Sequence, residues 1–150
     1  MKKIILILAC LALLGCPKAV PFPETVKYVD VPGKSQKELH EAAKRWVATN
    51  FVSAKRVIEY DNVEEGTLIG NSKIRHVCKK WDVSFTMRLD SKDEKYRVSF
   101  YNVCWYAGGV GESCEFREKY ITLVQNTFEE KIAAELYNYL TTGIETEKDW

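Results

Sequence analysis

Apolar and polar side chains alternate over two long stretches in the second half of the chain, residues 77–89 and 95–106. This alternation is typical of strands with one buried face and one solvated face. Opposed residues in a hairpin share a face, so pairing Asp90 with Lys95 aligns the apolar positions of the two stretches. The aligned pairs are Leu89 with Tyr96, Met87 with Val98 and Phe85 with Phe100. The pattern predicts a long hairpin with one apolar face.

Two other segments carry apolar side chains at helical spacing. Residues 35–50 begin with Ser35 and Glu38, whose spacing is that of a capping box at a helix N-terminus. The spacing predicts a surface helix whose solvated side includes His40. A second helix is predicted over residues 118–142, where Gly143 is a natural stop.

Shorter segments complete the fold. A two-residue turn at 64–65 would place Tyr60 opposite Ile69 on the core face. Three glycines in residues 107–113 indicate a flexible loop. The remaining strands are predicted at residues 24–31, 55–61 and 67–74, with Val29 and Val31 of the first pointing inward. The order strand, helix, four strands, helix predicts an α+β fold with an antiparallel sheet.

The N-terminus resembles a bacterial lipoprotein export signal. Lys2 and Lys3 precede an apolar run over residues 4–15, shorter than the roughly 20 apolar residues that span a membrane. The following Leu13-Leu14-Gly15-Cys16 resembles a lipobox, which implies cleavage before Cys16 and lipid attachment to it. The alternatives are an uncleaved anchor and an ordinary secretory signal. We therefore expect a signal peptide at 1–15, a lipidated tether at 16–23, one domain at 24–143 and a frayed tail at 144–150.

Charge and cysteine content narrow the chemistry. Removing residues 1–15 lowers Lys plus Arg from 22 to 20 against 21 acidic residues, so the formal net charge becomes −1. That balance argues against nucleic acid as a partner. Cys104 and Cys114 are predicted to form a disulfide that pins the glycine-rich loop, while Cys78 stays a buried free thiol. No paired C-x-x-C unit is present, and neither a metal nor another cofactor is expected.

The polar face of the hairpin is the predicted binding surface. In the register above, Arg88 lies directly opposite Arg97, and two adjacent guanidinium groups suit a carboxylate or phosphate. Tyr101, Val103 and Trp105 would continue that face as an aromatic strip. In the alternative, Asp90 lies diagonal to Arg97 and merely neutralises the pair, and Trp105 tucks under the glycine loop.

Catalysis is not predicted. An enzyme would need a nucleophile with a base, or an acid–base pair in a pocket. His40 and His76 are the only histidines, and nothing in the sequence brings them to the carboxylate candidates Asp82, Glu112 and Glu115.

A family resemblance adds to these predictions. The short motifs Val31-Pro32-Gly33-Lys34-Ser35, Glu65-Gly66 and Ile69-Gly70, with Lys92-Asp93 and Tyr96-Arg97, follow one another in an order that resembles a family described as a domain of unknown function with a TATA-binding-protein-like fold. The resemblance covers roughly residues 24–106 and includes Glu38-Leu39, Trp46, Phe51, Ser53-Ala54-Lys55 and Asp61. It implies a curved antiparallel sheet with two helices on one face, in exported proteins found mainly in Gram-negative bacteria. It implies no activity.

The expected function is a non-catalytic binding or interaction module on a lipid anchor. Its expected place is the cell envelope, at the periplasmic face of the outer membrane, and its partners are the membrane and an envelope protein or small anionic ligand. The alternatives are a structural envelope component that acts through oligomers and a periplasmic hydrolase.

Overall fold

The computed structural model describes residues 19–51, 57–77, 81–108 and 111–143. The predicted Cys16 anchor, the Cys78 thiol and the 144–150 tail lie outside the described residues. The elements, in chain order, are β1 (Ala19–Pro21), β2 (Thr25–Asp30), α2 (Gln36–Asn50), β3 (Ile58–Asn62), β4 (Thr67–Ile74), β5 (Trp81–Lys92), β6 (Lys95–Ala107), β7 (Gly111–Ser113), β8 (Glu115–Arg117), α4 (Glu118–Asn126), η1 (Thr127–Ala133) and α5 (Ala134–Thr142).

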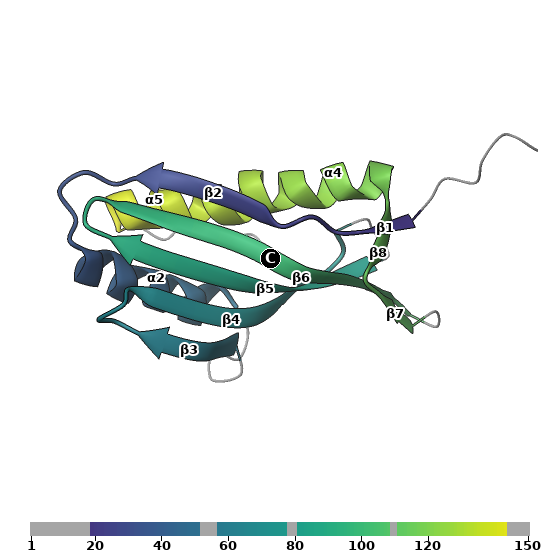
Figure 1. Cartoon of the computed structure of the whole chain (residues 1–150), viewed down its shortest axis with the longest axis horizontal. Coiled ribbons are helices and arrows are strands. Elements are labelled where there is room, and N and C mark those ends of the chain that lie inside the picture. The colour runs from purple at the N-terminus through teal and green to yellow at the C-terminus, as the bar shows by residue number, and fades with distance from the viewer. Residues whose placement is uncertain (1–18, 52–56, 78–80, 109–110, 144–150) are drawn as a thin grey trace, which may run out of the picture.

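An antiparallel sheet in the order β2-β6-β5-β4-β3 forms one layer, and β7 extends it beside β6. Helix α2 and the continuous helix α4–η1–α5 cover one face (Figure 1). No helix of the described residues covers the other face, which we call the open face. The predicted α+β architecture with two helices on one face is confirmed, and so is the last helix over residues 118–142. Within the described residues, none of the helices has the length and apolar character needed to cross a membrane.

Helix α2 begins where the sequence predicts. Ser35 accepts a hydrogen bond from the Glu38 N–H, and the Ser35 N–H donates to the Glu38 carboxylate, which completes the capping box. One prediction for this helix is wrong, because His40 is buried rather than solvated. Its Nε2 lies 2.8 Å from Asp61 Oδ1 of β3, so this ring nitrogen has a polar partner.

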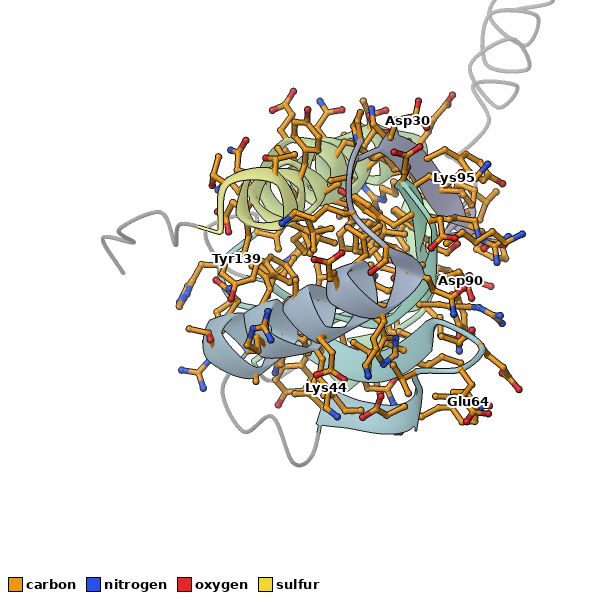
Figure 2. The ribbon with its side chains drawn as sticks, turned by 90° about the vertical axis from the view of Figure 1, so that its left-hand side faces the viewer. Asp30, Lys44, Glu64, Asp90, Lys95 and Tyr139 are labelled. Atoms are coloured by element: carbon orange, nitrogen blue, oxygen red, sulfur yellow. A yellow bond between two sulfur atoms is a disulfide. The ribbon has the colours of Figure 1, made fainter. Side chains whose placement is uncertain are left out.

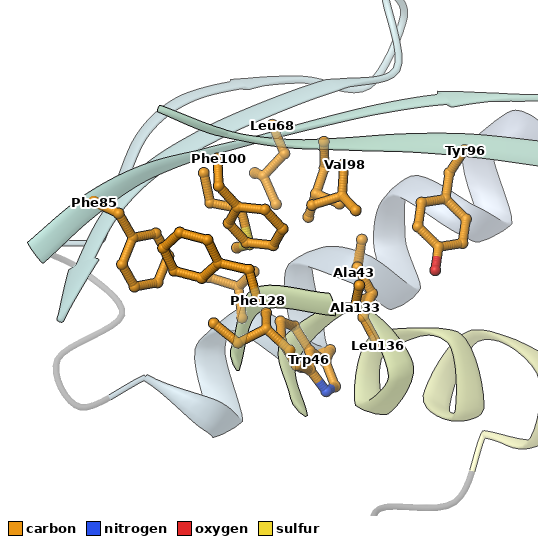
Figure 3. Close-up of a cluster of buried hydrophobic side chains, with 14 of the residues drawn as sticks. Ala43, Trp46, Leu68, Phe85, Tyr96, Val98, Phe100, Phe128, Ala133 and Leu136 are labelled. Carbon is orange, nitrogen blue, oxygen red and sulfur yellow. The ribbon is translucent and has the colours of Figure 1, made fainter. Parts of the chain in front are cut away.

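The core lies between the sheet and the two helices (Figure 3). The predicted stripe of α2 packs down onto the strands through Leu39, Ala43, Trp46 and Val47. Phe128 of η1 stacks on Phe100 of β6 at 4.5 Å between ring centroids, and Phe85 of β5 lies 4.9 Å from Phe128. Burial of such aromatic side chains is the main stabilising contribution to a small domain.

Three turns at one end of the sheet are joined to the start of α2. Gly33 N–H donates to the Glu94 carboxylate, and Gln36 N–H donates to Asp93 Oδ1. The Gln36 side chain donates to backbone carbonyls of the β3–β4 turn, where Gly66 has a φ of 70°. Three of the motifs behind the family resemblance, Val31-Pro32-Gly33-Lys34-Ser35, Glu65-Gly66 and Lys92-Asp93, lie in this turn cluster, where their contacts join the turns to α2.

The β5–β6 register differs from the prediction by two residues. A two-residue turn at 93–94 pairs Lys92 with Lys95, so Arg97 lies opposite Asp90, and Arg88 lies opposite Ser99. The predicted opposition of Arg88 and Arg97 is therefore wrong. A shift of two residues keeps each side chain on its predicted face, because the side-chain period of a strand is two.

A β-bulge then reverses the faces of β6. Thr86 pairs with Tyr101, and Ser84 pairs with Cys104. Phe85 of β5 therefore lies opposite two residues of β6, Asn102 and Val103. Asn102 adopts a φ of 50°, the left-handed region that asparagine tolerates better than most residues. Beyond the bulge, Val103 is buried against the helices instead of facing outward as predicted.

Three smaller predictions also change. Tyr60 does pair with Ile69, but Tyr60 is exposed and the buried neighbour is Leu68, so this pair faces away from the core. Part of the predicted loop, 111–113, forms β7 against β6. Residues 19–21 of the predicted tether form β1, which pairs with β8, and Phe22 packs edge-on against Phe116 at 5.3 Å.

Candidate functional site on the open face of the sheet

The open face carries side chains from the central strands β5 and β6 and the edge strand β2. Asp90 of this face is labelled in Figure 2. Near the 93–94 turn, the Asp90 carboxylate accepts hydrogen bonds from both predicted arginines. Arg88 Nε lies 3.0 Å from each oxygen of Asp90, and Arg97 Nε lies 3.0 Å from Oδ2. Thr67 Oγ1 of β4 donates to Asp90 Oδ1 at 3.0 Å. We call these four side chains the Arg–Asp–Arg cluster.

Burial and charge act against each other at Asp90, whose side chain is 17% exposed. Burial alone would raise the pKa of this carboxyl. The hydrogen bonds from Arg88, Arg97 and Thr67 outweigh that effect and hold the pKa of Asp90 below its usual value. In return, the hydrogen bonds to Asp90 raise the pKa of each arginine, and Tyr28 adds to this effect at Arg97.

The two guanidinium groups remain accessible. The Arg88 and Arg97 side chains are 40% and 39% exposed, so each keeps part of its donor surface on the open face after binding Asp90. With one carboxylate between two cations, the trio carries a formal charge of +1. Charge-assisted bonds from fixed guanidinium groups are the usual protein contacts for carboxylate and phosphate.

Of the two predicted aromatic residues, one belongs to this surface. Tyr101 pairs with Thr86 on the open face, half-buried, and its phenol contributes to raising the pKa of Arg88. Trp105 lies beyond the bulge on the helix side, where it stacks on Trp81 at 4.8 Å and donates from Nε1 to the Glu115 carbonyl at 2.9 Å. Its predicted place in the binding strip is wrong, because the bulge turns Trp105 away from the open face.

Tyr28 is the residue of this surface that the sequence did not single out. It lies on β2 directly opposite Arg97, and 73% of it is exposed. The predicted inward orientation of Val29 implies that Tyr28 points outward, but nothing in the sequence placed β2 beside β6. An exposed aromatic next to an arginine is a common combination in binding surfaces.

The remaining predicted residues lie away from the cluster. Cys104 is joined to Cys114 by a disulfide. Ser84 donates to Glu112 at 3.2 Å, and Lys73 pairs with Asp82 at 3.0 Å, while Asp82 also accepts from the His76 N–H. These contacts lie at the start of β5, the end of β6 and β7, at the opposite end of the hairpin from the 93–94 turn.

The acid–base candidates do not form one site in the structure. His40 and Lys44 of α2 both bind Asp61, and the hydrogen bond from Lys44, followed by that from His40, holds the pKa of Asp61 below its usual value. This trio lies on the helix side of β3. In the described part of the chain, no group of three or more His, Cys, Asp or Glu residues is arranged to hold a metal ion.

A pocket lies on the helix side of the molecule. It has a volume of about 570 Å³ and separates the start of α2 from the end of α5, lined by charged side chains of both signs, including Lys34, Glu38 and Arg45, around Leu39 and Leu140. Ser35 and Glu38 at its rim already bond to one another, and Asp93 accepts from the N–H of Gln36. The N-terminus of α2 is therefore occupied by the protein's own carboxylates rather than open to a phosphate.

Comparison with known proteins identifies the architecture. A family model described as a domain of unknown function (DUF4468) with TBP-like fold matches residues 26–105. A TBP-like protein from Parabacteroides distasonis superposes with a TM-score of 0.61 at 15% identity, covering 78% of this chain and 91% of that one. A DUF4468 family protein from Bacteroides ovatus gives a TM-score of 0.61 at 10% identity, covering 83% and 89%. No protein of curated function matches the sequence.

Proposed function

Since the chain belongs to the DUF4468 family of domains of unknown function with a TBP-like fold, we propose that it is a non-catalytic binding module of the cell envelope that takes an anionic group on its open face. The observation that carries this proposal is the Arg–Asp–Arg cluster. Two arginines are oriented by one carboxylate and still expose about two-fifths of their side chains to solvent. Orienting the guanidinium groups in advance lowers the entropy lost when an anion binds.

The ligand chemistry follows from the donors. A carboxylate or phosphate group that contacts both arginines would meet a local formal charge of +1, and Tyr28 and Tyr101 on either side could contact its apolar portion. The fold adds nothing to this choice, because one fold serves many functions. The nucleic-acid role of the protein after which the fold is named is not part of the proposal, and the formal charge of −1 after removal of residues 1–15 supports that exclusion.

The anchor completes the proposal. Cys16 would carry the lipid, and the module would sit at the periplasmic face of the outer membrane. The support is the charged and apolar N-terminal segment followed by Leu13-Leu14-Gly15-Cys16. The non-catalytic part rests on where the acid–base candidates lie, since His40 is paired with Asp61 on the helix side, while Asp82 and Glu112 bond to Lys73 and Ser84.

The test uses the full-length chain in detergent and two defined probes, acetate and inorganic phosphate. Arginine Nε–H resonances are followed during titration, and we expect those of Arg88 and Arg97 to shift together and to saturate. Arg88→Gln with Arg97→Gln should abolish the response. Lys73→Gln is the matched control, because Lys73 also pairs with an aspartate on the open face. Saturable shifts with acetate alone favour a carboxylate ligand, and shifts with phosphate alone favour a phosphate. If neither anion moves these two resonances more than those of other arginines, the cluster is not an anion site.

A further inference from the structure

Strand β2 is an edge strand, so half of the backbone N–H and C=O groups of β2 point away from the sheet. It pairs with β6 on one side, in a regular register over six residue pairs from Thr25–Phe100 to Asp30–Lys95. Val31 N–H donates to the Glu94 carbonyl at 2.7 Å, which identifies Val31 and Glu94 as a hydrogen-bonded pair of the ladder. Hydrogen-bonded and non-hydrogen-bonded pairs alternate along antiparallel strands. The N–H and C=O groups of Val26, Tyr28 and Asp30 therefore point outward.

The two edges of the sheet are not equivalent. At the other edge, β3 is five residues long and its register with β4 shifts between Ile58 and Tyr60, an irregularity of the kind that protects an edge from further pairing. Strand β2 is six residues long and regular. Among the residues that the structure describes, it carries the most exposed large apolar side chain, Tyr28, together with Val26 at 40%.

The sequence of β2 restricts how this edge could pair with itself. In an antiparallel pair centred on Tyr28, Tyr28 faces its own copy, Val26 faces Asp30 and Lys27 faces Val29. All three outward-pointing residues then meet one another, and like charges are not opposed. Aromatic pairs across strands are stabilising.

The neighbouring registers are less favourable. Centring the pair on Lys27 places Lys27 opposite Lys27 and Glu24 opposite Asp30, which opposes like charges at the middle and at both ends. Centring it on Val29 places Val26 opposite Pro32, which has no N–H to donate. Like-charge opposition in one neighbouring register and the missing Pro32 N–H in the other thus favour the register centred on Tyr28.

From these observations we infer that β2 is a self-association edge, at which a second copy of this chain adds in antiparallel orientation centred on Tyr28 and joins the two sheets. The resulting dimer is isologous and closed, because a two-fold axis through Tyr28 relates the copies. That axis is perpendicular to the sheet, so the helix layers of both copies lie on the same side. The helix α4–η1–α5 runs beside β2 (Figures 1 and 2), and it carries exposed Leu123 and Tyr137. This inference goes beyond the proposed anion site and does not depend on it.

The contact is tested by placing the photoreactive residue p-benzoylphenylalanine at position 28 of the full-length chain. The matched control has the same residue at position 60, because Tyr60 is also an exposed tyrosine on an edge strand. After irradiation we expect a covalent dimer from position 28, with the adduct mapped to residues 25–30 of the second copy, and at least a several-fold weaker one from position 60. Equal yields from both positions, no dimer from position 28, or adducts only to a different protein would each overturn the inference.

The register is tested by replacing Val26 with a charged residue of either sign. Position 26 faces Asp30 of the other copy only when the strand pair is centred on Tyr28. Both variants change an outward-facing side chain, and circular dichroism checks that each remains folded. By sedimentation of the full-length chain in detergent, Val26→Asp should weaken dimerisation several-fold, and Val26→Lys should preserve or strengthen it. The reverse order, or equal effects of the two variants, contradicts the proposed pairing.

Discussion

Asp90 lies directly opposite Arg97 across the β5–β6 hairpin, and the same carboxylate binds Arg88 two residues away on its own strand. A single, mostly buried anion thus orients two cations on the open face. Its removal should affect stability and pH dependence as well as binding.

Asp90→Asn is expected to lower the free energy of unfolding by about 1.5–3 kcal/mol, the usual contribution of hydrogen bonds to a charged group. Urea denaturation at pH 7 measures it. The matched control is Asp82→Asn, because the Asp82 side chain is more exposed, at 26%, and pairs with one cation, Lys73. That control should cost about 0–1 kcal/mol. Equal losses in the two variants would mean that the arginines do not depend on Asp90.

The lowered pKa of Asp90 gives this contribution a definite pH dependence. The unfolded chain binds the proton more tightly, so the stabilisation is complete above the unfolded pKa of about 3.9 and is lost as the pH falls through the lower folded-state pKa. The difference in stability between wild type and Asp90→Asn should therefore be constant near neutral pH and shrink below about pH 4. Urea titrations from pH 7 to 2 check this, and a difference that grows on acidification would contradict it.

Asn102 should be needed for its backbone conformation at the bulge. With a φ of 50°, Asn102→Val is expected to cost about 1–3 kcal/mol, because a β-branched residue is strained there. Asn102→Gly removes the same hydrogen bond to Thr86 without that strain and should cost less. Thermal unfolding compares the two variants. If valine is tolerated as well as glycine, the bulge does not rest on this residue.

Alanine substitutions at Gly66 and Gly33 distinguish the cost of a steric clash from the cost of backbone strain in the turn cluster. Both glycines have a positive φ, of 70° and 77°. A Cβ on Gly66 would lie 2.3 Å from the Ser91 carbonyl oxygen, whereas one on Gly33 meets no heavy atom within 4 Å. Gly33→Ala should therefore cost about 1–2 kcal/mol from backbone strain alone, and Gly66→Ala should cost clearly more. Chemical denaturation measures both losses of stability. Because of the close contact at Gly66, a loss for Gly66→Ala no larger than that for Gly33→Ala would contradict this prediction.

The proposed anchor predicts a labelling result. Cys16→Ser should lose incorporation of radioactive palmitate in cells, because the acylated thiol is gone. Inhibition of the lipoprotein signal peptidase should leave the wild-type precursor uncut. Cys10→Ser is the matched control and should label normally, since Cys10 lies within the segment that is removed. Continued labelling of Cys16→Ser would refute lipidation at this residue.

Local signals in the sequence were enough for much of the fold. The capping box at Ser35 and Glu38 marked the start of α2, and regular apolar spacing with Gly143 marked the last helix. The β5–β6 hairpin followed from alternation alone. Its register was two residues off, because alternation is unchanged by such a shift and only the tight turn at 93–94 specifies the pairing.

The candidate site depended on less visible features. One extra residue at Asn102 moved Trp105 to the helix side, and an asparagine in a strand is too weak a signal for a bulge. Tyr28 joined the surface only because β2 pairs with β6, a contact between segments about 70 residues apart. His40 was placed in solvent because its partner Asp61 belongs to another element. The positions of Tyr28 and His40 thus depended on contacts between segments that are distant in the sequence.

Because β1 pairs with β8, only a short linker separates the proposed lipid anchor at Cys16 from the folded domain. Three peptide links separate Cys16 from Ala19, which is about 11 Å when fully extended. Two lipidated copies in one leaflet can be related only by an axis along the membrane normal, and the axis of the β2 pair is perpendicular to the sheet. A lipidated dimer would therefore lie with its joined sheet parallel to the bilayer, held at two opposite ends. Pairing would convert a domain that pivots on one anchor into a flat platform that presents its open face in a single orientation.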